Sequence, residues 1–239
     1  DEPQIPDVPD NPKMINEYLE GYDWLRGDGS KYVPAYRVIP GSNTYKSKDV
    51  SIRAIIRPTT LNYAAGTLVN VCGCSGSVDG VRYRQMNICL KVVDSNTYQV
   101  GYFSCVSNAD TSALQFFGNY KVGEILEIEG NENSLTVNGV EYAIANESVQ
   151  MNMPTLIALY SGSSIGGRSY AGEISKLEYL ANGTVYSSLT PAKATQELPA
   201  EMSYDGTAKA VDTIGFWDSV NGKFLTSSSA NGWSVADEE

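Results

Sequence analysis

Short stretches in which apolar and polar residues alternate recur along this 239-residue chain, with almost no helical periodicity. Each stretch is bounded by Gly, Asn, Asp or Ser, which favour turns. The predicted strands are 50–57, 82–93, 98–106, 124–129, 134–137, 155–160, 172–179 and 184–189. Asn-Gly pairs at 138–139, 182–183 and 221–222 tolerate the positive φ angles that two-residue hairpin turns require. The sequence therefore predicts an all-β fold, with residues 14–19 as the only helix-like stretch.

Composition limits the partners of this fold. The chain has 28 acidic and 17 basic residues, and this net charge of −11 repels phosphate backbones, so no nucleic acid partner is expected. Nor does any apolar run approach the roughly 18 residues of a membrane span. Residues 1–22 open with four prolines among twelve residues and are predicted to form an acidic, Pro-rich tether. Residues 23–239 are predicted to form one domain.

The cysteine and histidine content restricts the chemistry further. The chain has no histidine, which excludes the common zinc-ligand sets and the Ser-His-Asp and Cys-His nucleophiles. Its four cysteines, Cys72, Cys74, Cys89 and Cys105, lack the CxxC spacing typical of a zinc site. Buried free thiols and a disulfide both remain open as interpretations.

The predicted hairpin around Ser95-Asn96 suggests a binding face. If these two residues form the turn, Asp94 pairs with Thr97, and the register follows by counting outward. One face of the hairpin is then mostly apolar and is assigned to the core: Met86, Ile88, Leu90, Val92, Gln99, Gly101, Phe103 and Cys105. The opposite face mixes aromatic rings with amides and hydroxyls: Tyr83, Gln85, Asn87, Cys89, Lys91, Tyr98, Tyr102 and Ser104. In this register Cys89 and Cys105 point to opposite sides and cannot form a disulfide.

Four segments in order resemble the concanavalin A-like lectin/glucanase (laminin G-like) family. They are L-x-GDG-x-KYV from Leu25, KVGEILEIEGNENSLTVNGVEY from Lys121, GEISKL from Gly172 followed by Asn182-Gly183-Thr184, and GFWDSVNGKF from Gly215. The resemblance runs from about Leu25 to Thr226, and the last segment is similar to an ending found in many such domains of secreted and surface proteins of anaerobic Gram-negative bacteria. It implies a two-sheet antiparallel jelly-roll sandwich, a fold that hosts binding modules and glycoside hydrolases alike.

The same resemblance raises two chemical possibilities. Glu127-Ile128-Glu129-Gly130-Asn131-Glu132 is similar to the catalytic strand of glucanases, in which two carboxylates share one face. We expect Gly130-Asn131 to form the turn instead, which would place Glu132 in a loop. No cofactor is expected, although the family implies a possible Ca²⁺ site, for which the loop residues Asp79, Asp94, Asn108 and Asp110 are candidates.

The function expected from these features is a non-catalytic carbohydrate-binding or adhesion module that takes a glycan or a glycosylated protein. Sugar sites combine a stacking ring with amide and guanidinium groups. The candidate ligand-binding residues are Tyr83, Arg84, Asn87, Tyr102, Arg168 and Tyr170. A glucanase-type glycoside hydrolase and a purely structural or protein-interaction domain are the alternatives.

The expected setting is a monomeric domain that is extracellular, at the cell surface or in the periplasm, with a possible lipid anchor upstream of the tether. The tripeptide Arg26-Gly27-Asp28 spells a cell-adhesion motif. Because Gly27-Asp28-Gly29 is expected to form a turn that feeds the first strand, the tripeptide is interpreted as part of the fold.

Overall fold

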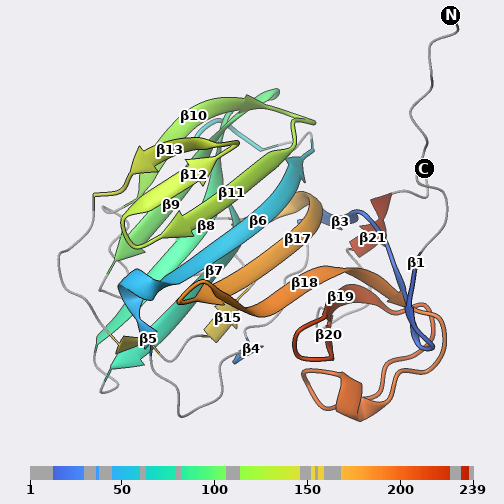
Figure 1. The fold of residues 1–239 in the computed structure, drawn as a ribbon. Helices are drawn as coiled ribbons and strands as arrows, with labels where there is room; N and C mark the ends of the chain where they lie inside the picture. The colour runs from blue at the N-terminus through green and yellow to red at the C-terminus, as the bar shows by residue number, and fades with distance from the viewer. Residues whose placement is uncertain are drawn as a thin grey trace, which may run out of the picture.

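The structure is a computed structural model that describes residues 13–29, 36–37, 45–59, 63–78, 82–105, 114–145, 152–153, 156–158, 168–226 and 233–236. Across these residues the chain is all-β, as predicted, and two large sheets pack against each other as a sandwich (Figure 1). Neighbouring strands are antiparallel except for one parallel pair, β16 with β7. Within the described ranges, two short 3₁₀ turns, Ser47–Asp49 and Ala200–Met202, lie between strands.

The first sheet has twelve strands, in the order β1-β2-β18-β17-β6-β11-β12-β13. Four further strands belong to this sheet. Strand β19 pairs with β18 and β20, and strand β3 pairs with β17 and β21. Its strands are β1 (Lys13–Asn16), β2 (Leu19–Gly21), β3 (Leu25–Asp28), β6 (Val50–Pro58), β11 (Leu126–Asn131), β12 (Ser134–Val137), β13 (Val140–Ala143), β17 (Ala171–Ala181), β18 (Thr184–Ala194), β19 (Ile214–Asp218), β20 (Lys223–Leu225) and β21 (Trp233–Val235).

The second sheet has seven strands, in the order β10-β9-β8-β7-β15-β4, with β16 also beside β7. These strands are β4 (Tyr36–Arg37), β7 (Leu68–Val78), β8 (Arg82–Asp94), β9 (Thr97–Cys105), β10 (Gln115–Lys121), β15 (Leu156–Ala158) and β16 (Arg168–Ser169). A separate two-stranded sheet pairs β5 (Tyr45–Lys46) with β14 (Asn152–Met153).

The main core lies between the two large sheets because each strand sends alternate side chains inward. Strand β6 buries Ile52 and Ile56 there, whereas Arg53 on the same strand points to the outer face and is exposed. Strand β8 contributes Met86 and Ile88 from the opposite layer. A smaller cluster beside β18 gathers Leu19, Ala192, Ala194, Leu198 and Phe224.

The Asn-Gly turns lie where the sequence predicts them. Asn138 and Asn182 have φ angles of 47° and 49°, and each opens a two-residue turn between antiparallel strands. The third pair, Asn221-Gly222, ends a four-residue connection, 219–222, between β19 and β20, where the sequence predicted a two-residue turn. Asn138, Asn182 and Gly222, whose φ angle is 62°, adopt the left-handed conformation at low cost.

The structure corrects the predicted N-terminal boundary. Residues 13–21, assigned to the tether, form β1 and β2, and β2 pairs with β18 of the twelve-stranded sheet. Leu19 is completely buried, so this segment belongs to the domain, and the helix predicted at 14–19 is wrong. Residues 1–12 lie outside the described part of the chain.

Arg26-Gly27-Asp28 also differs from its expected conformation. These residues lie within β3, which pairs with β17 on one side and β21 on the other. The strand ends at Asp28, and the φ angle of the next residue, Gly29, is +77°. The tripeptide is therefore part of a strand between two neighbours and is not a protruding loop.

Candidate functional site

A β-bulge at Val93 changes the predicted hairpin register by one residue. Asp94 pairs with Thr97, as predicted, but the register shifts at the bulge and Val92 then pairs with Tyr98. Val93 is the extra residue, and its side chain is exposed. Every cross-strand pair from Val92–Tyr98 to Gln85–Cys105 is shifted by one position from the predicted register. Each side chain of β9 therefore lies on the opposite face of the sheet from the one predicted.

This shift places Tyr102 in the core, and Tyr170, which lies outside this hairpin between β16 and β17, is in the core as well. Tyr102 pairs with Ile88, is fully buried, and donates a hydrogen bond from its hydroxyl to the carbonyl oxygen of Asn131 at 2.9 Å. Tyr170 is also buried, and its hydroxyl donates to the carbonyl oxygen of Glu173 at 3.2 Å. The prediction that Tyr102 and Tyr170 bind ligand is therefore wrong, because both rings pack in the sandwich interior.

Three other predicted residues are placed by their backbone only. Tyr83 and Arg84 lie on β8 opposite Ser77 and Gly76, and Arg168 lies on β16 beside Val69 of β7. Their side chains lie outside what the structure describes, so their predicted role in binding remains a prediction. All three belong to strands that adjoin β7 in the seven-stranded sheet.

The sixth residue, Asn87, lies on the outer face of that sheet, where the sequence predicts it. Cys89, two residues further along β8, points to the same side of the sheet. It packs with Phe103 in a small cluster apart from the main core. Asn70 pairs with Cys89 from β7 and shares this face. Both asparagines are only 3% exposed. We call the face that carries Asn70 and Asn87 the amide face.

Three of the four amide atoms of these two residues have no hydrogen-bond partner in the part of the chain that the structure describes. Both the Nδ2 and the Oδ1 of Asn87 are buried without one, as is the Nδ2 of Asn70. Native proteins pair nearly all such buried atoms, and leaving one unpaired costs about 1–3 kcal/mol. The sequence gives no sign of this feature beyond the polar residue types, because pairing depends on the neighbouring strands.

A glycine makes room for the Asn87 amide. Gly73 pairs with Asn87 across β7 and β8, and a Cβ atom at Gly73 would lie only 1.7 Å from the Asn87 Oδ1. The amide therefore lies flat over the backbone of β7. Any larger residue at position 73 would displace it.

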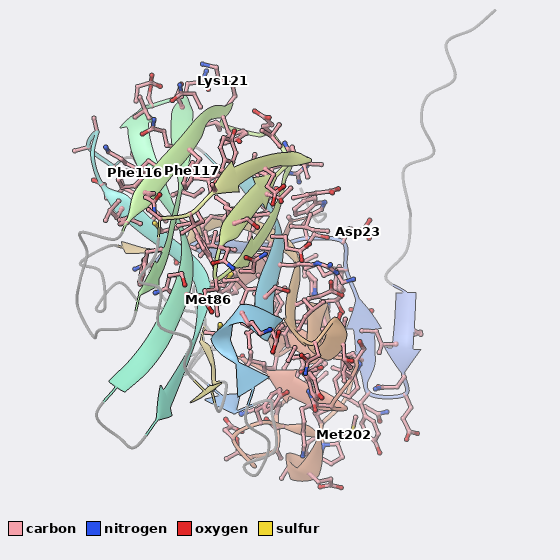
Figure 2. The ribbon with its side chains drawn as sticks, turned by 60° about the vertical axis from the view of Figure 1, so that its left-hand side comes forward. Asp23, Met86, Phe116, Phe117, Lys121 and Met202 are labelled. Atoms are coloured by element: carbon pink, nitrogen blue, oxygen red, sulfur yellow. The ribbon has the colours of Figure 1, made fainter. Side chains whose placement is uncertain are left out.

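A half-buried aromatic ring and a cation extend the amide face toward the sheet edge. Phe116, on the edge strand β10 (Figure 2), pairs with Gly101, which in turn pairs with Cys89. The Nζ atom of Lys91 lies 4.5 Å from the centroid of the Phe116 ring, a cation–π contact. The face thus offers amides, an ammonium group and an apolar ring, and these groups can hold hydroxyl-bearing ligands.

The outer face of the twelve-stranded sheet carries a different kind of surface. An open groove of about 320 Å³ has Ile55 among its lining and charged residues along its sides. Arg53 contacts Glu129 at 2.8 Å and Glu178 at 3.8 Å, and Lys176 contacts Glu178 at 2.7 Å. The cations and these two carboxylates neutralise one another, so we call this the ion-paired groove.

Next to this groove a buried carboxylate joins two arginines. The carboxylate of Glu173 is 2% exposed and accepts hydrogen bonds from Arg26 at 2.7 and 3.0 Å and from Arg57. The guanidinium carbon of Arg57 lies 4.6 Å from the centroid of the Trp24 ring. The Arg26 of the adhesion-like tripeptide is thus part of an internal ion pair.

The glucanase-like segment is only partly arranged as that family requires. Glu127 and Glu129 share the outer face of β11, and Arg53 binds the second of them through Nε and Nη2 at 2.8 and 3.2 Å. Strand β11 continues through Gly130 and Asn131, so the turn predicted there lies instead at Glu132-Asn133. Glu132 is in the turn, as expected, and is buried.

The calcium candidates do not form a recognisable site in the described residues. Asp94 is used locally, because its Oδ1 accepts the backbone amide of Asn96 at 2.8 Å, a bond that lowers the pKa of the carboxyl. Asp79, Asn108 and Asp110 lie outside the part that the structure describes. No group of three or more acidic or cysteine side chains that would hold a metal ion occurs within the described ranges.

Three cysteines are buried free thiols, one of the two interpretations that the sequence left open. Cys72 and Cys74 lie in the main core, and Cys89 lies on the amide face. Burial raises the pKa of Cys74 and of Cys89 to about 12. Thiols of this kind are poor nucleophiles at neutral pH.

Comparisons with known proteins identify no family. No protein-family model and no curated protein matches the chain. Two crystal structures of scytalido-glutamic peptidase with transition state analogues are similar at 11% sequence identity. The first has a TM-score of 0.35, and the match covers 85% of this chain and 95% of the peptidase chain. The second has a TM-score of 0.27, and the match covers 86% of both chains. Likeness this low carries no conclusion about function. No helix in the described residues is long and apolar enough to cross a membrane.

Proposed function

We propose that this chain is a non-catalytic carbohydrate-binding module that holds its glycan on the amide face of the seven-stranded sheet. The observation that carries the proposal is the pair of buried asparagines, because the Nδ2 of Asn70 and both amide atoms of Asn87 have no hydrogen-bond partner within the described residues. A sugar hydroxyl group both donates and accepts, so one saccharide can pair with the donor and the acceptor of Asn87. Binding then satisfies groups that are costly to leave unpaired in the free protein.

Phe116 and Lys91 supply the rest of a sugar-binding surface. The apolar face of a pyranose ring packs against aromatic carbon, while the ammonium group donates to ring hydroxyls. Because Asn70 and Asn87 are only 3% exposed, the ligand must displace what covers them. We therefore expect slow association, limited by local opening of the amide face.

The wider proposal follows the resemblance of the sequence to concanavalin A-like domains. We propose a jelly-roll topology, a monomeric state, and a location outside the cell, at its surface or in the periplasm. Analytical ultracentrifugation tests the monomer and distinguishes a binding module from a structural domain that buries this face against a second subunit.

The decisive experiment substitutes Asn87 by leucine, which has a similar volume and no polar atoms. A glycan array identifies the strongest saccharide, and titration calorimetry then compares the wild-type protein with Asn87→Leu and with Arg53→Gln. We expect Asn87→Leu to weaken binding at least about tenfold, the effect of losing roughly one to two hydrogen bonds. Arg53→Gln alters only the ion-paired groove on the other sheet and should bind normally.

Stability gives a second readout that separates a binding role from a structural one. Asn87→Leu removes a buried polar group without partners, so the free energy of unfolding should be unchanged or higher. Lower stability with unchanged saccharide affinity would contradict the proposal, and so would loss of binding in Arg53→Gln alone.

A further inference from the structure

The chain has four Asn-Gly pairs, and the three that the structure describes differ in how their asparagine side chains are held. Asn138-Gly139 and Asn182-Gly183 have matched backbones, with φ angles of 47° and 80° in the first pair and 49° and 72° in the second. Each pair lies in an exposed two-residue turn between antiparallel strands. Differences in their chemistry must therefore come mainly from the side chains.

Two of the asparagine amides are tied down. The Oδ1 of Asn138 accepts the backbone amide of Glu127 at 2.8 Å, and its Nδ2 donates to the carbonyl oxygen of Ile125 at 3.1 Å. The Nδ2 of Asn221 donates to the carbonyl oxygen of Tyr186 at 2.8 Å and to Asp218 Oδ2 at 2.9 Å. Each side chain must break two hydrogen bonds before it can rotate.

Asn182 has no such restraint. Its backbone amide donates to the carbonyl oxygen of Asp49 at 2.8 Å, but its side-chain amide makes no hydrogen bond within the described part of the chain. Both Asn182 and Gly183 are exposed to solvent. The following residue has no side chain to shield its backbone nitrogen.

We propose that Asn182 is a site of spontaneous, selective deamidation. Hydroxide removes the proton from the backbone nitrogen of Gly183, and this nitrogen then attacks Cγ of Asn182. A new C–N bond forms, the bond from Cγ to Nδ2 breaks, and ammonia leaves with a proton from water. Water then opens the five-membered succinimide at either carbonyl to leave aspartate or isoaspartate. Nothing is oxidised or reduced, and water is the only other reactant.

The modification changes a defined part of the sheet. It adds one negative charge to a chain that already carries −11. Isoaspartate also lengthens the backbone by one methylene group within the turn that joins β17 to β18. The cross-strand pairs next to this turn are Ala181 with Thr184 and Leu180 with Val185, so these pairs should loosen first.

The test follows Asn138, Asn182 and Asn221 in the folded protein. The protein is incubated at mildly alkaline pH, and peptide mass spectrometry measures conversion of each amide to acid. A protein-isoaspartate methyltransferase assay detects the isoaspartate product. We expect Asn182 to convert at least about tenfold faster than Asn138 or Asn221, because each of those side chains must lose two hydrogen bonds.

Two controls make the comparison decisive. In urea the three pairs lose their structure, so their rates should become similar. The variant Asn182→Gly keeps a residue that tolerates positive φ and should remove the fast conversion. The proposal is overturned if Asn138 or Asn221 converts as fast as Asn182 in the folded protein. It is also overturned if Asn182 stays intact there while the unfolded chain converts.

Discussion

The side chain of Gln115 binds the backbone of Ala145 as a neighbouring strand would. Its Nε2 donates to the Ala145 carbonyl oxygen at 2.9 Å, and its Oε1 accepts the Ala145 amide at 3.2 Å. Gln115 begins β10, the edge of the seven-stranded sheet, and Ala145 follows β13, the edge of the twelve-stranded sheet (Figure 1). The rings of Phe117 and Tyr142 lie 4.9 Å apart between the same strands. Side chains therefore connect the two sheet edges on this side of the sandwich.

Removing the Gln115 amide should loosen this connection. Gln115→Ala loses both hydrogen bonds to Ala145, and we expect the free energy of unfolding to fall by about 1 kcal/mol, since the site is partly exposed. Urea denaturation measures the change. Gln115→Glu keeps an acceptor for the Ala145 amide but loses the donor, so its stability should lie between the two. A midpoint for Gln115→Ala equal to that of the wild type would show that the connection adds no stability.

The two ion pairs on the outer face of the twelve-stranded sheet should differ in strength. Glu173→Gln removes the buried charge that two arginines share, and we expect a loss of about 2–3 kcal/mol. Glu129→Gln removes the partner of Arg53 in a pair whose side chains are 44% and 40% exposed, so its cost should stay below about 1 kcal/mol. Chemical denaturation of both variants checks this order, and equal costs would contradict it.

Gly27 should tolerate no side chain. A Cβ atom there would lie 3.0 Å from Cζ3 of Trp233 and 3.0 Å from the carbonyl oxygen of Tyr170. Gly27→Ala should destabilise the fold by about 1–3 kcal/mol, the usual cost of overpacking. Ser234→Ala, at an exposed position of the paired strand β21, is the matched control and should change little. Thermal unfolding distinguishes the two, and a stable Gly27→Ala would mean that the Trp233 ring shifts freely.

The buried thiols predict how stability changes at high pH. Burial raises the pKa of Cys74 and Cys89 from 9.0 to about 12, so the folded thiols keep protons that the unfolded thiols lose above pH 9. Their contribution is fully present below pH 9 and is lost as the pH rises toward 12. Each thiol should lower the free energy of unfolding by about 1.4 kcal/mol per pH unit in this window.

Denaturation at several pH values between 9 and 12 measures this slope. Cys89→Ala should reduce this slope by the contribution of one thiol, about 1.4 kcal/mol per pH unit. Near neutral pH the same variant should change stability only through the loss of packing. At neutral pH a thiol reagent should label Cys72, Cys74 and Cys89 only after unfolding. Rapid labelling of the folded protein at these positions would contradict the burial argument.

Much of the strand pattern could be predicted because it depends on local signals. The alternation of apolar and polar residues that ends at Val137 and the turn at Asn138-Gly139 both depend only on neighbouring residues. The structure confirms both the strand and the turn. The strands missed by sequence analysis include β7 and β10, which are rich in glycine or aromatic residues and alternate poorly. Without these strands the composition of the seven-stranded sheet could not be inferred.

The candidate site was predictable only in part. Asn87 could be assigned to an outer face because it alternates with core residues on one strand. Tyr102 was assigned to the same face only through an uninterrupted register across Val93, and a bulge there reverses its side. Alternation within a strand is local, whereas pairing between strands depends on one residue whose placement the sequence does not reveal.

By itself, the sequence determined an all-β chain with turns at Asn138-Gly139 and Asn182-Gly183, since backbone preference and the period of two act over a few residues. The tertiary structure alone decided the environment of each polar side chain. It placed Arg26 against Glu173, 147 positions along the chain, and left the amide of Asn87 without a hydrogen-bond partner among the described residues. Hydrogen bonding and burial depend on residues that are distant in sequence, and only the folded arrangement of the two sheets brings them together.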